Sequence, residues 1–163
     1  MKAVRVHTPG GPDAMRFEDA PEPTPKEGEA LVKVDAAGLN YIDVYFRSGQ
    51  YKAAAPFTLG MEAGGTVTAV GPKVTEVKVG DKVAYTGVPG AYAEYAAVPA
   101  ARLVQLPAGL TTKHGAAMML QVDSSWKILG YPGLAVAVFG LAALGGLWLV
   151  ISIIAADRKV RRR

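Results

Sequence analysis

The segment from Gly38 to Gly65 constrains the fold more than any other part of the sequence, because it joins two strand patterns through one short helix. Residues 32–37 alternate apolar and polar side chains, as a half-buried strand does. Asn40 then stands where a helix would begin, and Gly49 would end it, because glycine tolerates the left-handed conformation found just past helix ends. The glycines of residues 60–65 predict a second strand whose backbone approaches its neighbours closely.

Short strand patterns separated by glycine and proline turns occupy most of the remaining sequence up to residue 107. The predicted strands are Lys2–His7, Met15–Glu18, Thr66–Val70, Asp81–Tyr85, Ala91–Val98 and Leu103–Leu106. An apolar helix should follow from Thr111 to about Leu120. This arrangement predicts a mainly β (α+β) domain that folds as a small, partly open β-barrel.

Five sequence blocks together resemble one known family. They are Lys2–Val6, Gly10–Pro12, Asn40–Tyr51, Gly60–Gly65 and Val79–Val83. Through these blocks, residues 1–121 resemble the catalytic domain of the medium-chain dehydrogenase/reductase superfamily, and within it the zinc-free quinone oxidoreductases of the zeta-crystallin type. The resemblance implies a GroES-like fold, NADPH as the hydride donor, and a quinone or another small carbonyl compound as the substrate.

The same resemblance implies which residues line the reaction site. Asn40, Tyr45 and Tyr51 match positions where nicotinamide and quinone meet, and they are the predicted catalytic residues. Asn40 and Tyr45 are also the predicted contacts of the nicotinamide. An amide N–H and a phenol hydroxyl can each donate to a quinone oxygen during hydride transfer. Spacing alone leaves an alternative open, in which Asn40 caps a helix and the tyrosines are core or rim aromatics.

Neither zinc nor another metal is expected at this site. In zinc-dependent relatives a cysteine and a histidine occupy the positions that match Asn40 and Met61. An amide and a thioether are poor ligands for zinc. The chain has no cysteine, and its two histidines, His7 and His114, lie far apart in the sequence.

Three charged residues near the predicted site have local explanations. Asp43 and Arg47 lie four positions apart and are predicted to form an ion pair on one helix face, worth roughly a few tenths of a kcal/mol. Glu62 either orients side chains of the cleft or is a buried, hydrogen-bonded carboxyl group.

The sequence lacks the pattern that binds a dinucleotide. Such a site needs a glycine-rich turn between a strand and a helix, within a βαβ unit, to present backbone N–H groups to the pyrophosphate. Gly140, Gly145 and Gly146 do not have that spacing and lie in an apolar run. We therefore expect no Rossmann domain, and NADPH should not bind to this chain alone.

The C-terminal part differs in composition from everything before it. Residues 134–156 form 23 consecutive uncharged positions, and a helix needs about 20 apolar residues to cross a bilayer. We predict a linker at 122–133, a transmembrane helix at 134–156 and a basic tail at 157–163; a buried core helix is the alternative for the apolar run. This C-terminal part weakly resembles the membrane segment of the UbiB-like atypical kinases, without any of that family's kinase motifs.

Charge is concentrated in the basic tail. Residues 1–127 carry 13 basic and 13 acidic side chains, whereas the last seven residues carry five basic and one acidic. Nothing in this distribution points to nucleic-acid binding. The positive-inside rule would place the tail in the cytoplasm and the preceding domain outside. Because no signal peptide pattern opens the sequence, we instead expect a single-pass membrane protein whose N-terminal domain is cytoplasmic.

Three functions are compatible with these features. The first is the substrate-side half of an NAD(P)H-dependent quinone oxidoreductase, inactive alone as a truncated or fused chain. The second is a membrane-tethered reductase half that a partner chain completes with a Rossmann domain. The third is a binding or assembly module without catalysis, held at the membrane by contact with lipid.

Overall fold

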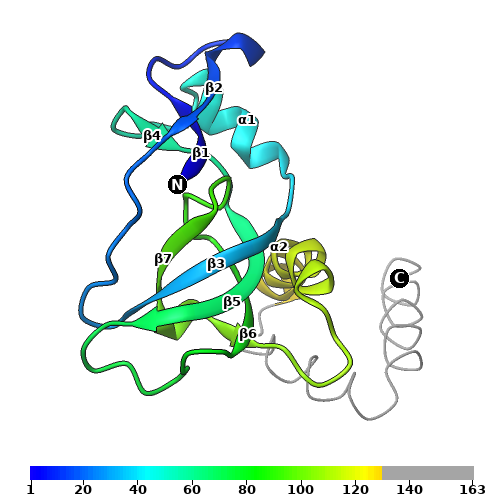
Figure 1. Cartoon of the computed structure of the whole chain (residues 1–163). Helices are drawn as coiled ribbons and strands as arrows, with labels where there is room; N and C mark the ends of the chain where they lie inside the picture. Colours follow the sequence, from blue (N-terminus) through cyan, green and yellow to red (C-terminus); the bar gives the residue numbers. More distant parts are fainter. Residues whose placement is uncertain (130–163) are drawn as a thin grey trace, which may run out of the picture.

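The computed structural model describes residues 1–129, which contain two antiparallel sheets and two α-helices (Figure 1). The smaller sheet has the order β2-β1-β4, with β1 at Lys2–Val6, β2 at Met15–Asp19 and β4 at Phe57–Thr58. The larger sheet has the order β7-β3-β5-β6-β8, with β3 at Glu29–Ala37, β5 at Glu62–Val70, β6 at Lys82–Thr86, β7 at Tyr95–Pro99 and β8 at Val104–Gln105. The helices are α1 (Tyr41–Ser48) and α2 (Thr112–Leu129), and single 3₁₀ turns stand at Pro12–Ala14 and Ala100–Arg102.

The larger sheet does not close into a barrel. Its edge strands β7 and β8 each pair with one neighbour, and within residues 1–129 they do not pair with each other. The prediction of a mainly β domain is therefore confirmed, with an open sheet at its centre. In Figure 1, α1 lies beside the smaller sheet and α2 lies against the larger one.

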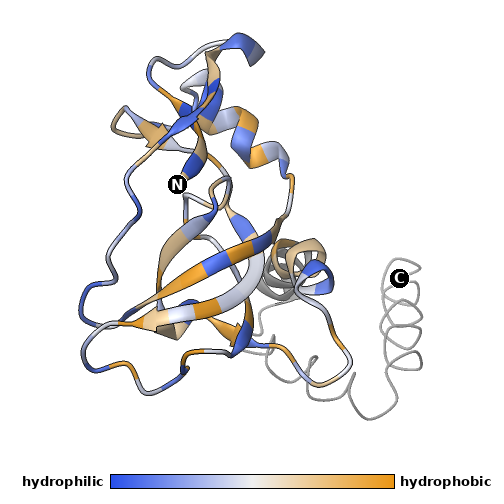
Figure 2. Cartoon of the chain, viewed as in Figure 1, coloured by the Kyte–Doolittle hydropathy of each residue, from blue (hydrophilic) through white to orange (hydrophobic). Residues whose placement is uncertain are grey.

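The core follows the two-residue period of the strands. Along β6, Val83 and Tyr85 are fully buried in the main core, while Ala84 between them belongs to a second cluster that includes Met119 of α2. Successive side chains of a strand point to opposite faces, so β6 has the main core on one face and α2 on the other. Figure 2 shows β3 as hydrophobic stretches separated by hydrophilic ones, in keeping with its half-buried position.

Helix α1 begins and ends where the sequence predicts. Asn40 is its N-cap, and Gly49 is its C-cap with a φ of 83°. Glycine adopts this left-handed conformation without the steric penalty of a side chain. The Gly49 N–H donates to the Phe46 carbonyl oxygen at 3.1 Å and so closes the last turn.

Helix α2 packs directly on the larger sheet at two glycines. A methyl group at Gly64 of β5 would collide with the carbonyl group of Thr112, and one at Gly115 would lie 2.6 Å from the Ala84 side chain. Only glycine permits so close an approach of helix and sheet backbones. The packing brings α2 to the start of β5, where the candidate site lies.

Two predicted boundaries are wrong. The strand predicted for Ala91–Val98 begins only at Tyr95, because the residues before it bond to other segments: the Tyr92 N–H donates to the Leu59 carbonyl oxygen. The helix expected to end near Leu120 continues to Leu129, through a segment without the glycine or proline that ends helices. It therefore includes residues 122–129 of the predicted linker.

No helix within residues 1–129 is both long and apolar enough to cross a membrane. The transmembrane helix predicted for residues 134–156 and the basic tail at 157–163 lie outside the described residues. Both remain predictions from the sequence.

Candidate functional site

Asn40, the first of the predicted catalytic residues, stands at the turn between β3 and α1. Its backbone N–H donates to Asp43 Oδ2 at 3.0 Å, and the Asp43 N–H donates to the Asn40 carbonyl oxygen at 3.0 Å. Its side-chain nitrogen reaches across to β5, where Nδ2 donates to Glu62 Oε2 at 2.8 Å. Asn40 thus occupies the helix N-cap, as its spacing suggests, and is also tied to a second element.

Glu62 is buried at the start of β5, with 2% of its surface exposed. Its second carboxyl oxygen, Oε1, accepts a hydrogen bond from the Leu120 N–H of α2 at 2.6 Å. A methyl group at Gly38 would collide with the Glu62 carboxyl group and with the Ala116 carbonyl oxygen of α2. Glycine at residue 38 therefore provides the space in which the Glu62 carboxyl group lies.

A hollow of about 380 Å³ opens beside this carboxyl group. It lies between the β3–α1 turn and α2, and its lining is Ala36, Ala37, Gly38, Leu39, Asn40, Glu62, Lys113, Ala116 and Ala117. Leu39 and Tyr41, the two neighbours of Asn40, are 86% and 71% exposed. The Asn40 amide therefore lines an open, mostly apolar hollow, and its second N–H has no partner among the described residues.

Tyr45 and Tyr51, the other predicted catalytic residues, are in contact. Their ring centroids lie 5.2 Å apart, and the Tyr51 N–H donates to the Tyr45 carbonyl oxygen at 3.0 Å. Tyr41 packs edge-on against Tyr45 at 5.2 Å, and Phe46 against Tyr51 at 5.6 Å. We call Tyr41, Tyr45, Phe46 and Tyr51 the aromatic cluster. The structure thus brings the two predicted tyrosines together, but neither lines the hollow beside Asn40.

The sequence gives no sign of the role of Tyr92. Its hydroxyl donates to Asp43 Oδ2 at 2.6 Å, and Asp43 is itself only 7% exposed. Burial and then the Asp43 carboxyl group raise the pKa of Tyr92 well above its ordinary value. We call Asn40, Asp43, Glu62 and Tyr92 the polar cluster.

The ion pair predicted between Asp43 and Arg47 is wrong. Among the described residues, no salt bridge joins these two side chains, and the buried Asp43 Oδ1 and Arg47 Nε atoms have no hydrogen-bond partner. The reason is that Asp43 Oδ2 already accepts from the Asn40 N–H and the Tyr92 hydroxyl. Spacing along one helix could not reveal a partner 49 residues further along the chain.

The positions that correspond to metal ligands in zinc-dependent relatives are occupied differently here. Asn40 bonds to Glu62, and Met61 lines a small apolar cavity of about 110 Å³ together with Phe46 and Leu59. His7 lies at the surface against Glu18, and His114 bonds within its own first turn of α2 to Thr111. Within residues 1–129, no group of three or more histidine, aspartate or glutamate side chains could hold a metal ion.

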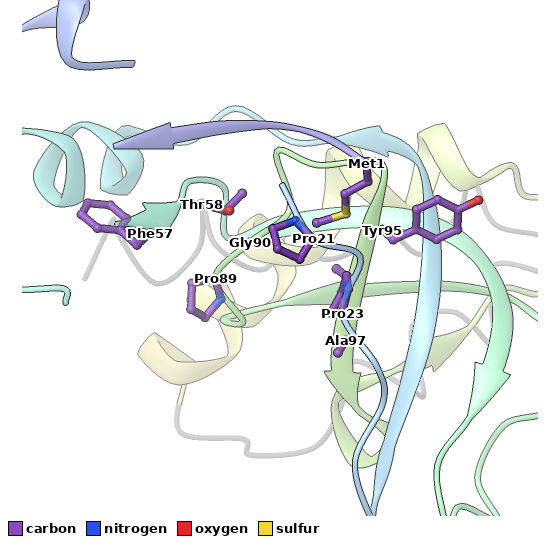
Figure 3. A pocket seen from close by; sticks show the side chains of 10 residues that line it. Met1, Pro21, Pro23, Phe57, Thr58, Pro89, Gly90, Tyr95 and Ala97 are labelled. Atoms are coloured by element: carbon purple, nitrogen blue, oxygen red, sulfur yellow. The ribbon is translucent and has the colours of Figure 1, made fainter. Parts of the chain in front are cut away.

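A third hollow has none of the predicted site residues in its lining (Figure 3). Its volume is about 340 Å³, and it is lined by Met1, Pro21, Pro23, Phe57, Thr58, Pro89, Gly90, Tyr95, Ala96 and Ala97. This lining contains no charged side chain. Its side-chain hydroxyl groups belong to Thr58 and Tyr95, and it contains no amide or carboxyl side chain like those beside Asn40.

A nicotinamide cofactor would find only part of its site in the described residues. Asn40 and the open hollow could contact one end of such a molecule. All strand pairings within residues 1–129 are antiparallel, so this part of the chain contains no βαβ unit to hold a pyrophosphate.

Two known families match the sequence. Residues 26–108, about half of the chain, match the family described as alcohol dehydrogenase GroES-like domain. Residues 115–155 match the family described as ABC1/UbiB kinase-like C-terminal domain. The second match begins inside α2 and continues beyond the described residues.

Curated relatives of this chain are quinone oxidoreductases. The protein from Pseudomonas aeruginosa is 43% identical over 122 residues, which are 74% of this chain and 38% of that protein. The protein from Lama guanicoe is 37% identical over 156 residues, which are 91% of this chain and 47% of that protein. This second alignment continues past Gln121, where the resemblance seen in the sequence ends. The chain spans less than half the length of these relatives.

Solved structures of quinone oxidoreductases are also similar to this chain. A quinone oxidoreductase from Pseudomonas syringae has a TM-score of 0.76 at 41% identity, over 80% of this chain and 42% of that chain. The Escherichia coli quinone oxidoreductase, solved in complex with NADPH, has a TM-score of 0.76 at 33% identity, over 81% of this chain and 42% of that chain. A mycobacterial quinone oxidoreductase has a TM-score of 0.75 at 42% identity, with 81% and 42% of the two chains covered.

Proposed function

The chain belongs to the family of alcohol dehydrogenase GroES-like domains, and from this membership we propose that residues 1–121 are the substrate-side half of an NAD(P)H-dependent quinone oxidoreductase. The observation that carries the proposal is the Asn40 amide, which Glu62 holds at an open hollow on the helix that also bears Tyr45. The proposed half is inactive alone, because residues 1–129 provide no βαβ unit to hold a dinucleotide.

In this proposal each predicted residue has a chemical task. The nicotinamide, when bound, supplies the hydride. The free N–H of the Asn40 amide donates to a quinone oxygen and stabilises the negative charge that develops there. Tyr51 is 45% exposed, and its hydroxyl group donates a proton to that oxygen. Tyr45 packs against Tyr51 and contacts the nicotinamide side of the cleft.

NADPH oxidation by the purified full chain tests this proposal. With NADPH and menadione as the quinone, we expect no oxidation above that of the buffer, and no saturable NADPH binding. Steady quinone-dependent oxidation that falls in Tyr51→Phe, but not in Tyr41→Phe, would contradict the claim that the chain is inactive alone. Tyr41 is a matched control, since its ring also packs in the aromatic cluster.

The exposure of Leu39 and Tyr41 favours a second candidate, in which a partner chain completes the enzyme. Large apolar side chains at a cleft rim are typical of a surface that another protein covers. The partner would carry the Rossmann domain and hold NADPH. Adding a separately expressed nucleotide-binding domain of a quinone oxidoreductase should then restore quinone-dependent oxidation, and an unchanged rate at saturating partner would exclude this candidate.

We also propose that residues 134–156 cross a membrane and that the N-terminal domain is cytoplasmic. The support is the run of 23 uncharged residues and the match of residues 115–155 to the ABC1/UbiB kinase-like C-terminal domain. Protease added to sealed, right-side-out vesicles should leave residues 1–121 intact. Digestion of the domain from outside would mean that the positive-inside rule decides the orientation.

A further inference from the structure

The carboxyl group of Glu62 links the β3–α1 turn to helix α2. Among the described residues, no other hydrogen bond connects these two segments. Oε2 accepts from Asn40 Nδ2 at 2.8 Å, and Oε1 accepts from the Leu120 N–H at 2.6 Å. We propose that Glu62 is a positioning residue that couples the Asn40 amide to the backbone of α2. This inference rests on the proposed function in one respect only, that Asn40 meets the substrate.

Glu62 determines which atom of the Asn40 amide faces which way. A carboxyl oxygen 2.8 Å from the amide requires the nitrogen to face it, because an amide oxygen there would set two acceptors against each other. One N–H of Asn40 is used in this way, and the other remains for a ligand in the hollow. Without Glu62 the amide can rotate by half a turn and present its oxygen, which cannot donate to a quinone.

The bond to Leu120 ties the same carboxyl group to the helix. An N–H inside a helix normally donates to the carbonyl group four residues earlier. The Leu120 N–H also donates to Glu62 Oε1, and the Ala116 carbonyl oxygen, four residues earlier, lies beside the space left by Gly38. The position of α2 on the sheet is therefore fixed by this carboxyl group as well as by packing.

A movement of α2 away from β5 would pull the Glu62 carboxyl group away from Asn40. The coupling free energy is reciprocal, so loss of the Asn40 bond should weaken the Leu120 bond by as much as loss of the Leu120 bond weakens the Asn40 bond. Since α2 leads into the C-terminal part of the chain, Glu62 gives that part a direct connection to the predicted substrate donor. The connection needs no movement of the strands themselves.

Hydrogen exchange at the Leu120 amide tests this coupling. The measurement uses the ¹⁵N-labelled full chain in detergent micelles, with Asn40→Ala, Glu62→Gln and the double variant. Glu62→Gln should raise the Leu120 exchange rate at least tenfold, because glutamine offers only one acceptor for two donors. Asn40→Ala should raise it about fivefold, although Asn40 does not contact Leu120. In the Glu62→Gln background, Asn40→Ala should cause no further change.

Glu94→Gln is the matched control. Glu94 is an exposed carboxylate that accepts a backbone N–H from Lys2 at 2.7 Å, away from Asn40 and α2. This variant should leave both the Leu120 exchange rate and the Asn40 side-chain amide signals unchanged, whereas Glu62→Gln should shift those side-chain signals. A general loss of stability would instead change exchange at amides throughout the molecule.

Three results would overturn the inference. They are an unchanged Leu120 rate in Glu62→Gln, an unchanged rate in Asn40→Ala, and an equal effect of Asn40→Ala with and without Glu62. If Glu62→Gln does not fold, the Asn40→Ala variant alone tests the inference, and an unchanged Leu120 exchange rate in that variant overturns it. The experiment contains neither NADPH nor a quinone, so its outcome is separate from that of the oxidation assay.

Discussion

The polar cluster and the aromatic cluster both include residues of helix α1, yet they are held in different ways. In the polar cluster, Asp43 and Glu62 are buried and every carboxyl group bonds to at least two donors from other residues. In the aromatic cluster, ring contacts at 5.2–5.6 Å hold side chains that remain partly exposed, and Tyr41 and Tyr51 are the most open of them.

For the proposed site, the difference predicts a division of tasks. A buried carboxyl group that accepts two hydrogen bonds fixes its donors in one orientation, as a site on rigid elements requires. An open aromatic surface can receive a planar ligand without breaking existing hydrogen bonds. Substitutions in the polar cluster should therefore lower stability, whereas loss of the Tyr51 hydroxyl from the aromatic cluster should change ligand binding.

The largest effect is expected at Gly38, whose missing side chain makes room for the polar cluster. Gly38→Ala would place a methyl group against the Glu62 carboxyl group and the Ala116 carbonyl oxygen. We expect the free energy of unfolding to fall by about 2–3 kcal/mol, as overpacking does in protein interiors. Urea denaturation followed by circular dichroism measures this.

Gly11→Ala is the control for that substitution, because a methyl group at Gly11 has no neighbour within 4 Å. Its effect should stay within about 0.5 kcal/mol. Equal losses in the two variants would mean that the space at Gly38 is not what holds the polar cluster.

A smaller loss is expected for Tyr92→Phe, which removes the hydroxyl that bonds to Asp43. Hydrogen bonds to charged groups contribute about 1.5–3 kcal/mol, and the partial exposure of Tyr92 places the expected loss at the lower end. Tyr41→Phe, in the aromatic cluster, should change the free energy of unfolding by less than about 0.5 kcal/mol. A larger loss in Tyr41→Phe than in Tyr92→Phe would reverse the comparison between the clusters.

The loss in Tyr92→Phe should depend on pH. Burial and the Asp43 carboxyl group raise the pKa of Tyr92, whereas an unfolded tyrosine titrates near about 10. The contribution of the protonated hydroxyl is therefore complete below about pH 10 and is lost as the pH rises further. The difference in unfolding free energy between the wild type and Tyr92→Phe should narrow between pH 9 and pH 11. A difference that stays constant over this range would contradict the raised pKa.

The smallest effect on stability is expected for Tyr51→Phe. The ring contacts with Tyr45 and Phe46 remain, and the Tyr51 hydroxyl has no hydrogen-bond partner among the described residues. The free energy of unfolding should change by less than about 0.5 kcal/mol, while quinone affinity should fall about fivefold through the lost hydrogen bond. Titration of each variant with menadione measures the affinity; unchanged binding would remove Tyr51 from the site.

Local signals in the sequence predict α1 and its surroundings well. Asn40 and Gly49 mark the two ends of the helix because capping depends on residues within one turn. The glycines of residues 60–65 predict close backbone approach, and methyl groups at Gly64 and Gly65 would indeed collide with the Thr112 and Lys33 carbonyl groups. Both features depend on backbone geometry, which the glycine itself reveals.

Contacts between distant segments could not be predicted in the same way. A spacing of four on a helix predicts Arg47 as the partner of Asp43, yet the hydroxyl that bonds to Asp43 belongs to Tyr92, 49 residues further along the chain. For Glu62 the sequence leaves two alternatives open, a residue that orients the cleft or a buried carboxyl group. The structure shows the second alternative, a buried and hydrogen-bonded carboxyl group, and its bond to Asn40 is the basis on which we propose the first.

The most direct test of the account is to map where a quinone binds on the full chain. Menadione titrated into the ¹⁵N-labelled protein in detergent micelles should shift the signals of Asn40, Tyr45 and Tyr51 together, with a single dissociation constant. The signals of Tyr95 and Ala97, in the hollow of Figure 3, should not move. Shifts confined to the hollow of Figure 3, or no saturable shift at Asn40, Tyr45 and Tyr51, would contradict the proposal that this chain carries the substrate side of a quinone oxidoreductase.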